Sequence, residues 1–469
     1  MALKNKKSQF AEWYPEVVQE AGLADYSSVG GCMVIKPLAY SIWEKIQQHF
    51  DKTIKSTGHK NAYFPLFVPE SLLKKEEQHF EGFQAEVAWI ERKDEKEERV
   101  ALRPTSETII YDSFSKWIRS WRDLPLLINQ WCNVVRWETK VTRLFLRTRE
   151  FLWQEGHTAH ISKEDADKEV LFILNEYKKL MEELLAIPVL IGKKSEGEKF
   201  PGALYTTTLE ALMPDGRALQ MGTSHNLGQH FAKVFDIKFL DKSEKESFVW
   251  QTSWGISTRL IGALAMVHGD DKGLILPPSV ASVQVVIVPI LFEDSKKQVL
   301  KKAAEVKASL EKLCITSHLD DRTECTPGWK YNEWELKGVP LRIEIGPKDL
   351  EKDQLVLVRR DTGEKAAVKN LKAVKTTLDK IQEDLFQKAK KFLESNIADV
   401  KAKSEFEKAI KEKKFARGWW CHTESCEKQI KEDTTATVRV ITFEQPKKKE
   451  KCFYCGKEGK DFVYVAKAY

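Results

Sequence analysis

Apolar residues recur every four positions early in the chain, which indicates an amphipathic helix. This helix should stop at Gly58, and a strand-like run around residues 63–65 follows it. Farther along, Ser162 and Asp165 are typical of the start of a helix, which we expect to continue through Leu185. The apolar positions of the first helix are Leu38, Ile42, Ile46, Phe50 and Ile54.

The pattern changes after the Pro277-Pro278 pair, which is typical of a boundary between structural units. From there on, β-branched runs alternate with stretches of helical apolar periodicity. Strands that alternate with helices favour a compact α/β domain. The predicted strands cover 283–288, 341–345 and 355–358, and the predicted helices cover 301–313 and 371–392.

Length and composition indicate a folded protein of several domains. The 469 residues suggest about three domains of ~150 residues each, and we place them at 1–280, 281–395 and 396–469. Hydrophobic residues make up 42% and charged residues 31%, so the chain can bury cores and is not a disordered protein. No apolar run approaches ~18 residues, and the first residues lack the apolar stretch of a secretory signal. We therefore expect a cytoplasmic protein without a membrane span. The net charge of +6 is too weak to indicate nucleic-acid binding by itself.

Two strand-like runs carry arginines, carboxylates, aromatic rings and a histidine at alternating positions. Arg136 and Glu138 are two residues apart, and side chains at that spacing share one face of a strand. Arginine donates paired hydrogen bonds to phosphates, and a carboxylate can accept from the amino group of a base. This face therefore suits a nucleotide, and a solvated, salt-bridged face is the alternative. The second run brings Arg147, Phe151, Trp153, Glu155 and His157 to one side.

The common nucleotide-binding motifs are missing from the sequence. No G-x-G-x-x-G occurs. Gly192 and Gly197 have the spacing of a P-loop but precede Glu198-Lys199 instead of Lys-Ser or Lys-Thr. We interpret this segment as a surface turn.

Four of the eight cysteines cluster near the end of the sequence. Cys421 and Cys426 are separated by four residues, Cys452 and Cys455 by two, and 25 residues lie between the pairs. Two closely spaced thiolate pairs joined by a loop are typical of a structural zinc site with four ligands. Chance clustering or two disulfides are the alternatives, and the lack of a secretory signal favours zinc.

Three segments resemble, in order, the three motifs of the class II aminoacyl-tRNA synthetases. The predicted helix and strand up to Pro65 resemble motif 1, the dimer-interface element, and the segment 255–262, in which Arg259 opens a helix, resembles motif 3. Four further segments are more specific, and together they resemble the prolyl-tRNA synthetase family over essentially the whole chain. The residues that resemble motif 2 are Arg136, Glu138, Arg147, Phe151 and Glu155. The specific segments are 103–107 (RPTSE), 151–160 (FLWQEGHTAH), 222–225 (GTSH) and 251–255 (QTSWG).

This resemblance implies a fold. The first unit would be an α+β catalytic domain with an antiparallel sheet, the class II synthetase fold. An α/β anticodon-binding domain and a small zinc-binding α/β domain would follow. The zinc domain is similar to that of the archaeal and eukaryotic type of the family. About 95 residues separate Glu155 from Gln251, too few for the editing insertion of the bacterial type.

The resemblance also implies residue roles, with Arg136 and Arg259 as catalytic residues. Alternatives remain for individual positions: Thr105 and Glu107 could cap a helix that starts near Thr108, and Trp153 could be core. Gln251 would lie near a Mg²⁺-linked group. The implied ATP-binding residues are Arg136, Glu138, Arg147, Thr148, Phe151, Gln220, Thr223 and Arg259. The implied proline-binding residues are Thr105, Glu107, Arg136, Trp153, Glu155, His157, His225 and Ser253. The implied zinc ligands are Cys421, Cys426, Cys452 and Cys455.

The activity implied is ATP-dependent attachment of L-proline to its tRNA through a prolyl-adenylate, with release of AMP and pyrophosphate. A cytoplasmic homodimer would use Mg²⁺ and a structural Zn²⁺ and contact both the acceptor end and the anticodon of tRNA. Other hypotheses are a threonyl, glycyl or seryl enzyme, a non-catalytic synthetase-like regulator or RNA-binding protein, and a zinc-dependent nucleic-acid module. Residues that could read anticodon bases, unless they form a solvated charged edge, are Lys330, Trp334, Glu335, Arg342, Glu344 and Lys348.

Overall fold

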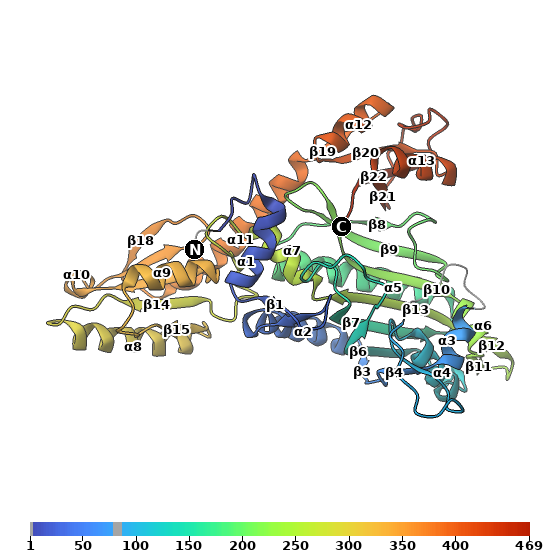
Figure 1. The fold of residues 1–469 in the computed structure, drawn as a ribbon, viewed down its shortest axis with the longest axis horizontal. Helices are drawn as coiled ribbons and strands as arrows, with labels where there is room; N and C mark the ends of the chain where they lie inside the picture. Colours follow the sequence, from blue (N-terminus) through green and yellow to red (C-terminus); the bar gives the residue numbers. More distant parts are fainter. Residues whose placement is uncertain (1–2, 78–86) are drawn as a thin grey trace.

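The computed structural model describes residues 3–77 and 87–469, and the chain forms three successive parts (Figure 1). The first part is built on a large, mostly antiparallel sheet, the second on a smaller mixed sheet, and the third on strands at the end of the sequence. In the part of the chain that the structure describes, no helix is both long enough and apolar enough to cross a bilayer.

The large sheet confirms the antiparallel sheet expected for the first part. Its order is β19-β20-β22-β21-β8-β9-β10-β13-β7-β6-β3, and the strands from β8 to β6 pair antiparallel. The two longest neighbours, β6 and β7, form a hairpin, and β13 pairs with the other edge of β7. The strands of this part are β1 (Ala24–Tyr26), β2 (Met33–Ile35), β3 (Lys60–Asn61), β4 (Phe67–Pro69), β5 (Val100–Leu102), β6 (Leu126–Val135), β7 (Glu150–His160), β8 (Leu190–Lys193), β9 (Tyr205–Leu212), β10 (Ala218–Gly228), β11 (Lys238–Leu240), β12 (Glu246–Phe248) and β13 (Trp250–Ser257).

Helices α2, α5 and α7 cover one face of this sheet, and on the other face α4 and α6 cover one end and leave the rest uncovered for a site. The predicted first helix is α2, and Gly58 follows it with a positive φ of 94°. The predicted cap is also confirmed, because the Ser162 hydroxyl accepts from the Asp165 amide at the start of α5. Trp254 on β13 packs beneath these helices against Phe50. The helices of the first part are α1 (Phe10–Glu20), α2 (Pro37–Ser56), α3 (Glu70–Glu77), α4 (Glu107–Trp117), η1 (Trp121–Asp123), α5 (Lys163–Lys179), η2 (Leu180–Leu184), α6 (His230–Val234) and α7 (Arg259–His268).

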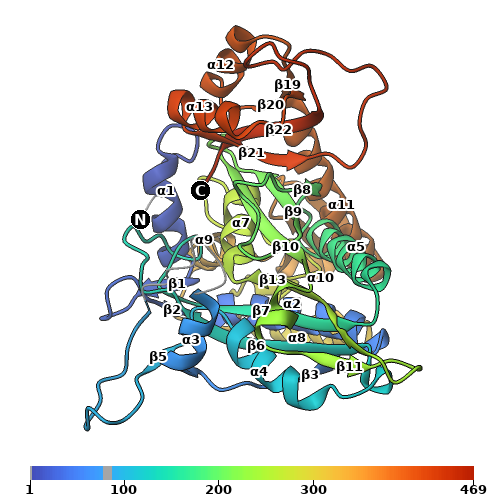
Figure 2. The same ribbon diagram turned by 90° about the vertical axis from the view of Figure 1, so that its right-hand side faces the viewer.

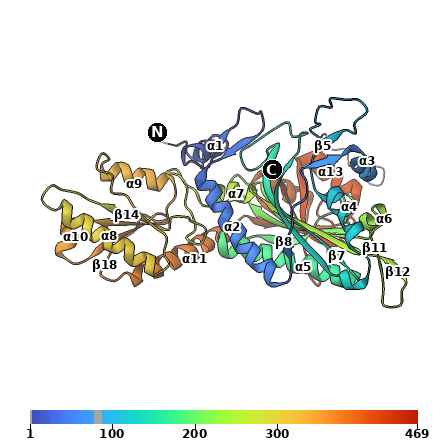
Figure 3. The ribbon, with the colours of Figure 1, turned by 90° about the horizontal axis from the view of Figure 1, so that it is seen from below.

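The second part has its own five-stranded sheet and lies beside the large sheet rather than on it (Figure 3). Its order is β15-β14-β16-β17-β18, with β14 parallel to both neighbours and the remaining pairs antiparallel. The predicted strands and helices are all found here, which confirms an α/β unit. The elements are β14 (Val285–Pro289), α8 (Lys296–Lys312), β15 (Ser317–Leu319), α9 (Pro327–Leu336), β16 (Leu341–Ile345), α10 (Pro347–Glu351), β17 (Leu355–Arg359), β18 (Lys365–Val368) and α11 (Lys372–Ser395).

An ion pair and backbone contacts fix the joint between these two parts. The guanidinium of Arg360 donates to both carboxylate oxygens of Asp270, at 2.9 and 2.6 Å. The amide of Leu274 donates to the carbonyl of Leu336 at 3.0 Å. Gly273 has a φ of +138°, and a Cβ there would lie 2.5 Å from the Leu336 backbone, so only glycine allows the two segments to approach this closely.

The third part continues the large sheet instead of standing apart from it (Figure 2). Strand β21 pairs antiparallel with β8 at Ile441 and Lys193. A Cβ on Gly192 would lie 2.2 Å from the carbonyl oxygen of Ile441, so glycine is needed at this contact. The elements are β19 (Ile397–Asp399), α12 (Lys403–Lys411), β20 (Phe415–Trp420), α13 (Glu424–Thr434), β21 (Ala436–Ile441) and β22 (Asp461–Lys467).

Candidate active site

Two adjoining cavities open on the uncovered face of the large sheet. We call them the inner cavity, of about 320 Å³, and the outer cavity, of about 550 Å³. They share a wall, and every residue that the resemblance implied for ATP or proline lines one cavity or the other. Gln251 is not among the described residues that line them. The shared wall consists of Arg136, Phe151, Ser257 and Arg259.

The outer cavity is strongly cationic. Glu138 has the one carboxylate side chain among the described residues that line it, and the rings of Phe151 and Tyr469 form apolar walls. An excess of guanidinium groups suits a chain of phosphates, and a single carboxylate suits the amino group of a base. The arginines of this cavity are Arg136, Arg143, Arg147, Arg217 and Arg259.

Arg136 and Arg259 are held at the junction of the two cavities. Arg259 begins α7, and its guanidinium donates to the carbonyls of Leu146 and Gln220 at 3.2–3.3 Å. Arg136 lies over the Phe151 ring, with its guanidinium carbon 5.3 Å from the ring centroid. Burial lowers the pKa of both groups, and the neighbouring charge of Arg136 helps to lower that of Arg259 to about 10. Both remain protonated at neutral pH, so the junction is a site for anionic groups.

The local structure around Arg136 corrects the strand-based prediction. Strand β6 ends at Val135, so Arg136 and Glu138 lie in the connection to β7 and do not share a strand face. One more backbone hydrogen bond nevertheless continues the pairing of β6 with β7, since the Arg136 amide donates to the Arg149 carbonyl at 2.7 Å. Arg147 also precedes β7. The turn of this connection, not strand alternation, brings these side chains to the outer cavity.

Strand β7 does present alternate side chains to the inner cavity, as predicted. Phe151, Trp153, Glu155 and His157 all line it. Glu155 and His157 are only 2% and 1% exposed, so this is not the solvated face of the alternative interpretation. The prediction for β7 is correct because the strand is regular over its whole length.

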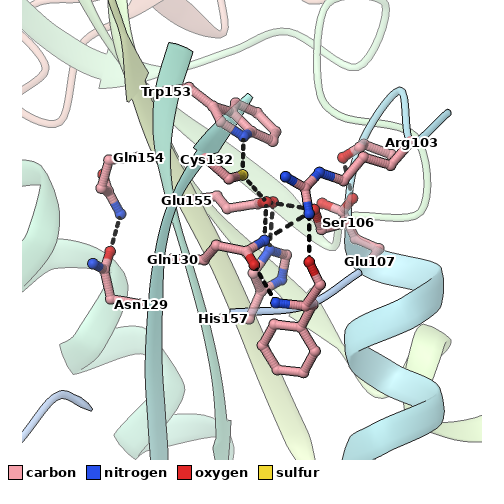
Figure 4. A network of polar contacts seen from close by, with 12 residues as sticks. Arg103, Ser106, Glu107, Asn129, Gln130, Cys132, Trp153, Gln154, Glu155 and His157 are labelled. Atoms are coloured by element: carbon pink, nitrogen blue, oxygen red, sulfur yellow. Dashed lines mark hydrogen bonds and ion pairs between the residues drawn. The ribbon is translucent and has the colours of Figure 1, made fainter. Parts of the chain in front are cut away.

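Glu155 is the centre of a buried polar network (Figure 4). Its carboxylate accepts from the Ser106 hydroxyl, from Gln130 Nε2 at 2.9 Å and from His157 Nε2 at 3.0 Å. Burial alone would raise the pKa of Glu155, but these hydrogen bonds lower it overall. Burial likewise opposes protonation of His157, yet the bond to Glu155 raises its pKa. The two side chains therefore form a buried ion pair.

Thr105 and Glu107 form a second carboxylate group at the start of α4. The Thr105 hydroxyl donates to the Glu107 carboxylate, which is only 4% exposed. The helix-cap alternative is not observed, because the N-cap residue is Ser106, and its hydroxyl donates to Glu155 and accepts from no amide of the helix. Burial, and the nearby charge of Glu155, raise the pKa of Glu107. A ligand ammonium at this carboxylate would supply the missing positive charge.

His225 and Trp153 form two further, neutral walls of the inner cavity. The ring of His225 lies 4.9 Å from that of Phe200 and its Nδ1 is 2.9 Å from the Thr206 hydroxyl. Burial lowers the pKa of His225 to about 3, so the ring is neutral. The indole of Trp153 donates to the sulfur of Cys132 at 3.2 Å, and Trp153 therefore lines the cavity instead of lying in the core. A small, mostly apolar ligand with one ammonium group fits these walls.

Sequence reasoning missed part of both cavities. The segment from Gly192 to Lys199, expected to be a surface turn, begins within β8, and its last two residues line the inner cavity together with Phe200 and Pro201. The departure from the P-loop pattern gave no signal of this role. In the outer cavity Arg143, Arg217 and Tyr469 were also missed. The Tyr469 ring lies 5.6 Å from the guanidinium carbons of Arg143 and Arg217.

The four clustered cysteines converge as predicted. Their sulfurs all lie within 4.8 Å of one another. Cys426 and Cys452 sulfurs are 3.9 Å apart and those of Cys421 and Cys455 are 3.5 Å apart, far beyond a disulfide bond of about 2.05 Å. Four thiolates ~2.3 Å from a tetrahedral zinc would be about 3.8 Å apart. The donor set therefore fits a structural zinc ion, whereas the disulfide alternative does not fit.

Several candidate anticodon residues are engaged inside the second part. Lys330 is only 2% exposed, and its Nζ donates to the carbonyl of Asp320 at 2.9 Å. The Trp334 indole donates to the Asp320 carboxylate at 2.9 Å. Arg342 pairs with Glu344 at 2.9 Å. These side chains belong to an internal network and do not form a solvated charged edge, and base reading by them stays a prediction.

Comparison with known proteins finds a matching family in each of the three parts. Residues 86–268 match the class II core domain of tRNA synthetases (G, H, P, S and T), residues 284–383 an anticodon-binding domain, and residues 403–469 the C-terminal domain of prolyl-tRNA synthetase. The fold is therefore that of a class II synthetase.

Similarity to individual proteins extends over nearly the full length. The proline–tRNA ligase of Natranaerobius thermophilus is 54% identical, over 99% of this chain and 97% of the relative. That of Alkaliphilus oremlandii is 53% identical over 98% and 96%, and proline–tRNA ligase 2 of Clostridioides difficile is 52% identical over 99% and 97%. The chain belongs to the prolyl-tRNA synthetase family.

Proposed function

We propose that the chain joins L-proline to its tRNA in two steps. ATP and proline first form prolyl-adenylate and pyrophosphate. The terminal ribose hydroxyl of the tRNA then attacks the prolyl carbonyl and releases AMP. The observation that carries this proposal is the shared wall, where Arg136 and Arg259 lie between a cationic cavity and a small amino-acid cavity.

The first step needs positioning and charge neutralisation more than proton transfer. The carboxylate of proline is already ionised at neutral pH, so no general base is needed for its attack on the α-phosphate. Arg136 lines both cavities and can contact both the proline carboxylate and the α-phosphate. This contact would hold the two anions close together and offset the negative charge that grows at phosphorus. Mg²⁺ would arrive with ATP as part of the substrate.

The adenine ring would stack in the outer cavity between Phe151 and Arg259, with Glu138 accepting from its amino group. Arg147, Thr148, Gln220 and Thr223 would complete the ATP site. All of these residues line the two cavities, which supports the assignment. Arg143, Arg217 and Tyr469 join this set because the structure adds them to the wall of the outer cavity.

Proline would occupy the inner cavity. Its secondary ammonium would lie at Thr105 and Glu107, where its positive charge would counter the burial that raises the pKa of Glu107. The ring would face Trp153, His225 and the other apolar walls. Glu155, His157 and Ser253 would line the pocket, with the Glu155–His157 ion pair balancing its own charge.

The test is amino-acid-dependent exchange of pyrophosphate into ATP, measured with a panel of amino acids. We expect exchange with proline. Activity with threonine, glycine or serine and none with proline would refute the proposal. A chain without exchange for any amino acid would support the non-catalytic alternative.

Three finer features complete the proposal. A zinc ion bound by Cys421, Cys426, Cys452 and Cys455 would have a structural role, because four protein ligands leave no open position. A homodimer is supported by exposed apolar side chains near the motif 1 segment. Sedimentation velocity tests it, and a monomer at micromolar concentration would contradict it. We place the enzyme in the cytoplasm, where it meets tRNA and ATP. The exposed apolar side chains are Tyr26 (58%), Val34 (52%), Tyr63 (72%) and Phe67 (50%).

A further inference from the structure

One wall of the inner cavity is a loop with little structure of its own. Residues 194–201, which we call the wall segment, connect β8 to β9, and their last four residues line the cavity. The amides of Glu198 and Lys199 both donate to the carbonyl of Ser195, at 3.1 and 3.0 Å. The Phe200 amide donates to the Thr206 hydroxyl at 2.9 Å, and the first half of the wall segment is placed by how Ser195 is held.

The third part of the chain holds the wall segment at two points. The fully buried Ser195 hydroxyl donates to the carboxylate of Glu427 on α13. The guanidinium of Arg439 on β21 donates to Glu198 Oε2 at 3.3 Å. Both anchors come from residues far from the wall segment in sequence, across the junction of β8 and β21.

Arg439 is itself fixed by buried charges. Glu210 on β9 accepts from Arg439 Nη2 at 2.9 Å and from Lys194 Nζ at 2.6 Å. Glu210 is fully buried, and Lys194 and Arg439 are each 6% exposed. Buried ion pairs gain little net stability, because removing charges from water costs about as much as their attraction returns. Their contribution here is a defined position for Arg439 and for the end of the wall segment that contains Lys194.

We propose that Glu427 and Arg439 are positioning residues for the amino-acid cavity. They hold the wall segment so that Phe200 stays against His225, and through them the third part of the chain sets the affinity for the amino acid. The inference rests on the proposed function for the identity of that amino acid. The outer cavity is bounded by other residues, so its affinity for ATP should not depend on these two anchors.

The experiment compares Ser195→Ala and Glu427→Ala with Glu432→Ala, an exposed position on the same helix. Loss of one buried hydrogen bond should raise the KM for proline about 5- to 20-fold, whereas the KM for ATP and kcat in pyrophosphate exchange stay within about twofold of the parent. Glu432→Ala should match the parent. Glu427→Gln should largely restore the KM, because its amide oxygen still accepts from Ser195. The double variant Ser195→Ala/Glu427→Ala should be no worse than either single variant, since both remove one interaction.

Hydrogen exchange gives a second readout that does not need activity. The amides of residues 198 and 199 should exchange about tenfold faster in Glu427→Ala, with α4 unchanged. An unchanged KM for proline with unchanged exchange, or an equal rise in the KM for ATP, would overturn the inference. If the parent activates a different amino acid, the proposed function fails, and the same KM comparison is made with that amino acid.

Discussion

Replacing Arg136 by alanine should nearly abolish adenylate formation without unfolding the chain. The side chain makes one hydrogen bond to the protein, from Nε to the Pro104 carbonyl at 3.3 Å, so its removal should cost little stability. At the reacting groups the loss is larger. Deleting one preorganised donor to a developing anion typically costs ~10²–10³ in rate. Arg136 lines both cavities and can contact two anions, so we expect a fall of at least ~10³ in kcat/KM, or about 4 kcal/mol.

The assay is pyrophosphate exchange over a range of ATP and proline concentrations, which gives kcat and both KM values, with circular dichroism to confirm the fold. Arg136→Lys keeps the charge but loses the planar fork, and its activity should lie between parent and alanine variant. Arg143→Ala is the matched control: Arg143 lines only the outer cavity, so its loss should raise the KM for ATP and leave that for proline unchanged. Near-normal exchange in a folded Arg136→Ala variant would refute the role assigned to this residue.

Three further outcomes are expected. Elemental analysis should find one zinc per chain, and Cys455→Ser should lower this content; a metal-free parent protein would contradict the site. In the folded chain the pKa of His157 is raised above 6.5 and that of Glu155 is lowered below 4.5. The ion pair between these two side chains should therefore stabilise the fold fully between pH 4.5 and 6.5. The stability that the ion pair contributes should fall as the pH rises through the pKa of His157, and also as the pH drops through the pKa of Glu155. The difference in melting temperature between the parent and His157→Gln should therefore shrink at both extremes of pH. A constant difference from pH 4 to 9 would argue against the ion pair. Finally, the enzyme should activate alanine weakly, because a missing methylene is worth only ~1–3 kcal/mol. It should not hydrolyse alanyl-tRNA, because the described chain between β7 and β13 contains core strands and helices but no inserted editing domain. Rapid enzyme-dependent deacylation of alanyl-tRNA would disprove this prediction.

The elements that sequence predicts well are those whose signal is local. The four-residue repeat of α2 and the alternation along β7 each follow from the geometry of one element, and both match the structure. The cysteine spacing likewise encodes a cluster that forms within one small unit. Local patterns were sufficient for these features because few distant contacts decide them.

Features that depend on distant contacts could not be predicted. Arg136 reaches both cavities because of the turn after β6, which periodicity does not show. Glu198 looks like part of a polar turn until Arg439 is placed beside it. Lys330 has the composition of a surface residue, yet its ammonium is buried against Asp320. In each case the three-dimensional arrangement, and not the local sequence pattern, determines the environment.

The joint between the first two parts has an entropic consequence for tRNA binding. Two domains on a free linker would lose rotational freedom when one rigid ligand contacted both, and part of the binding free energy would be spent on that ordering. Here the pairing of Arg360 with Asp270 and the close approach at Gly273 order the two parts during folding. The distance between the anticodon-binding domain and the cavities is therefore fixed before a tRNA binds. Only a tRNA of matching length can contact the anticodon-binding domain and the cavities at once.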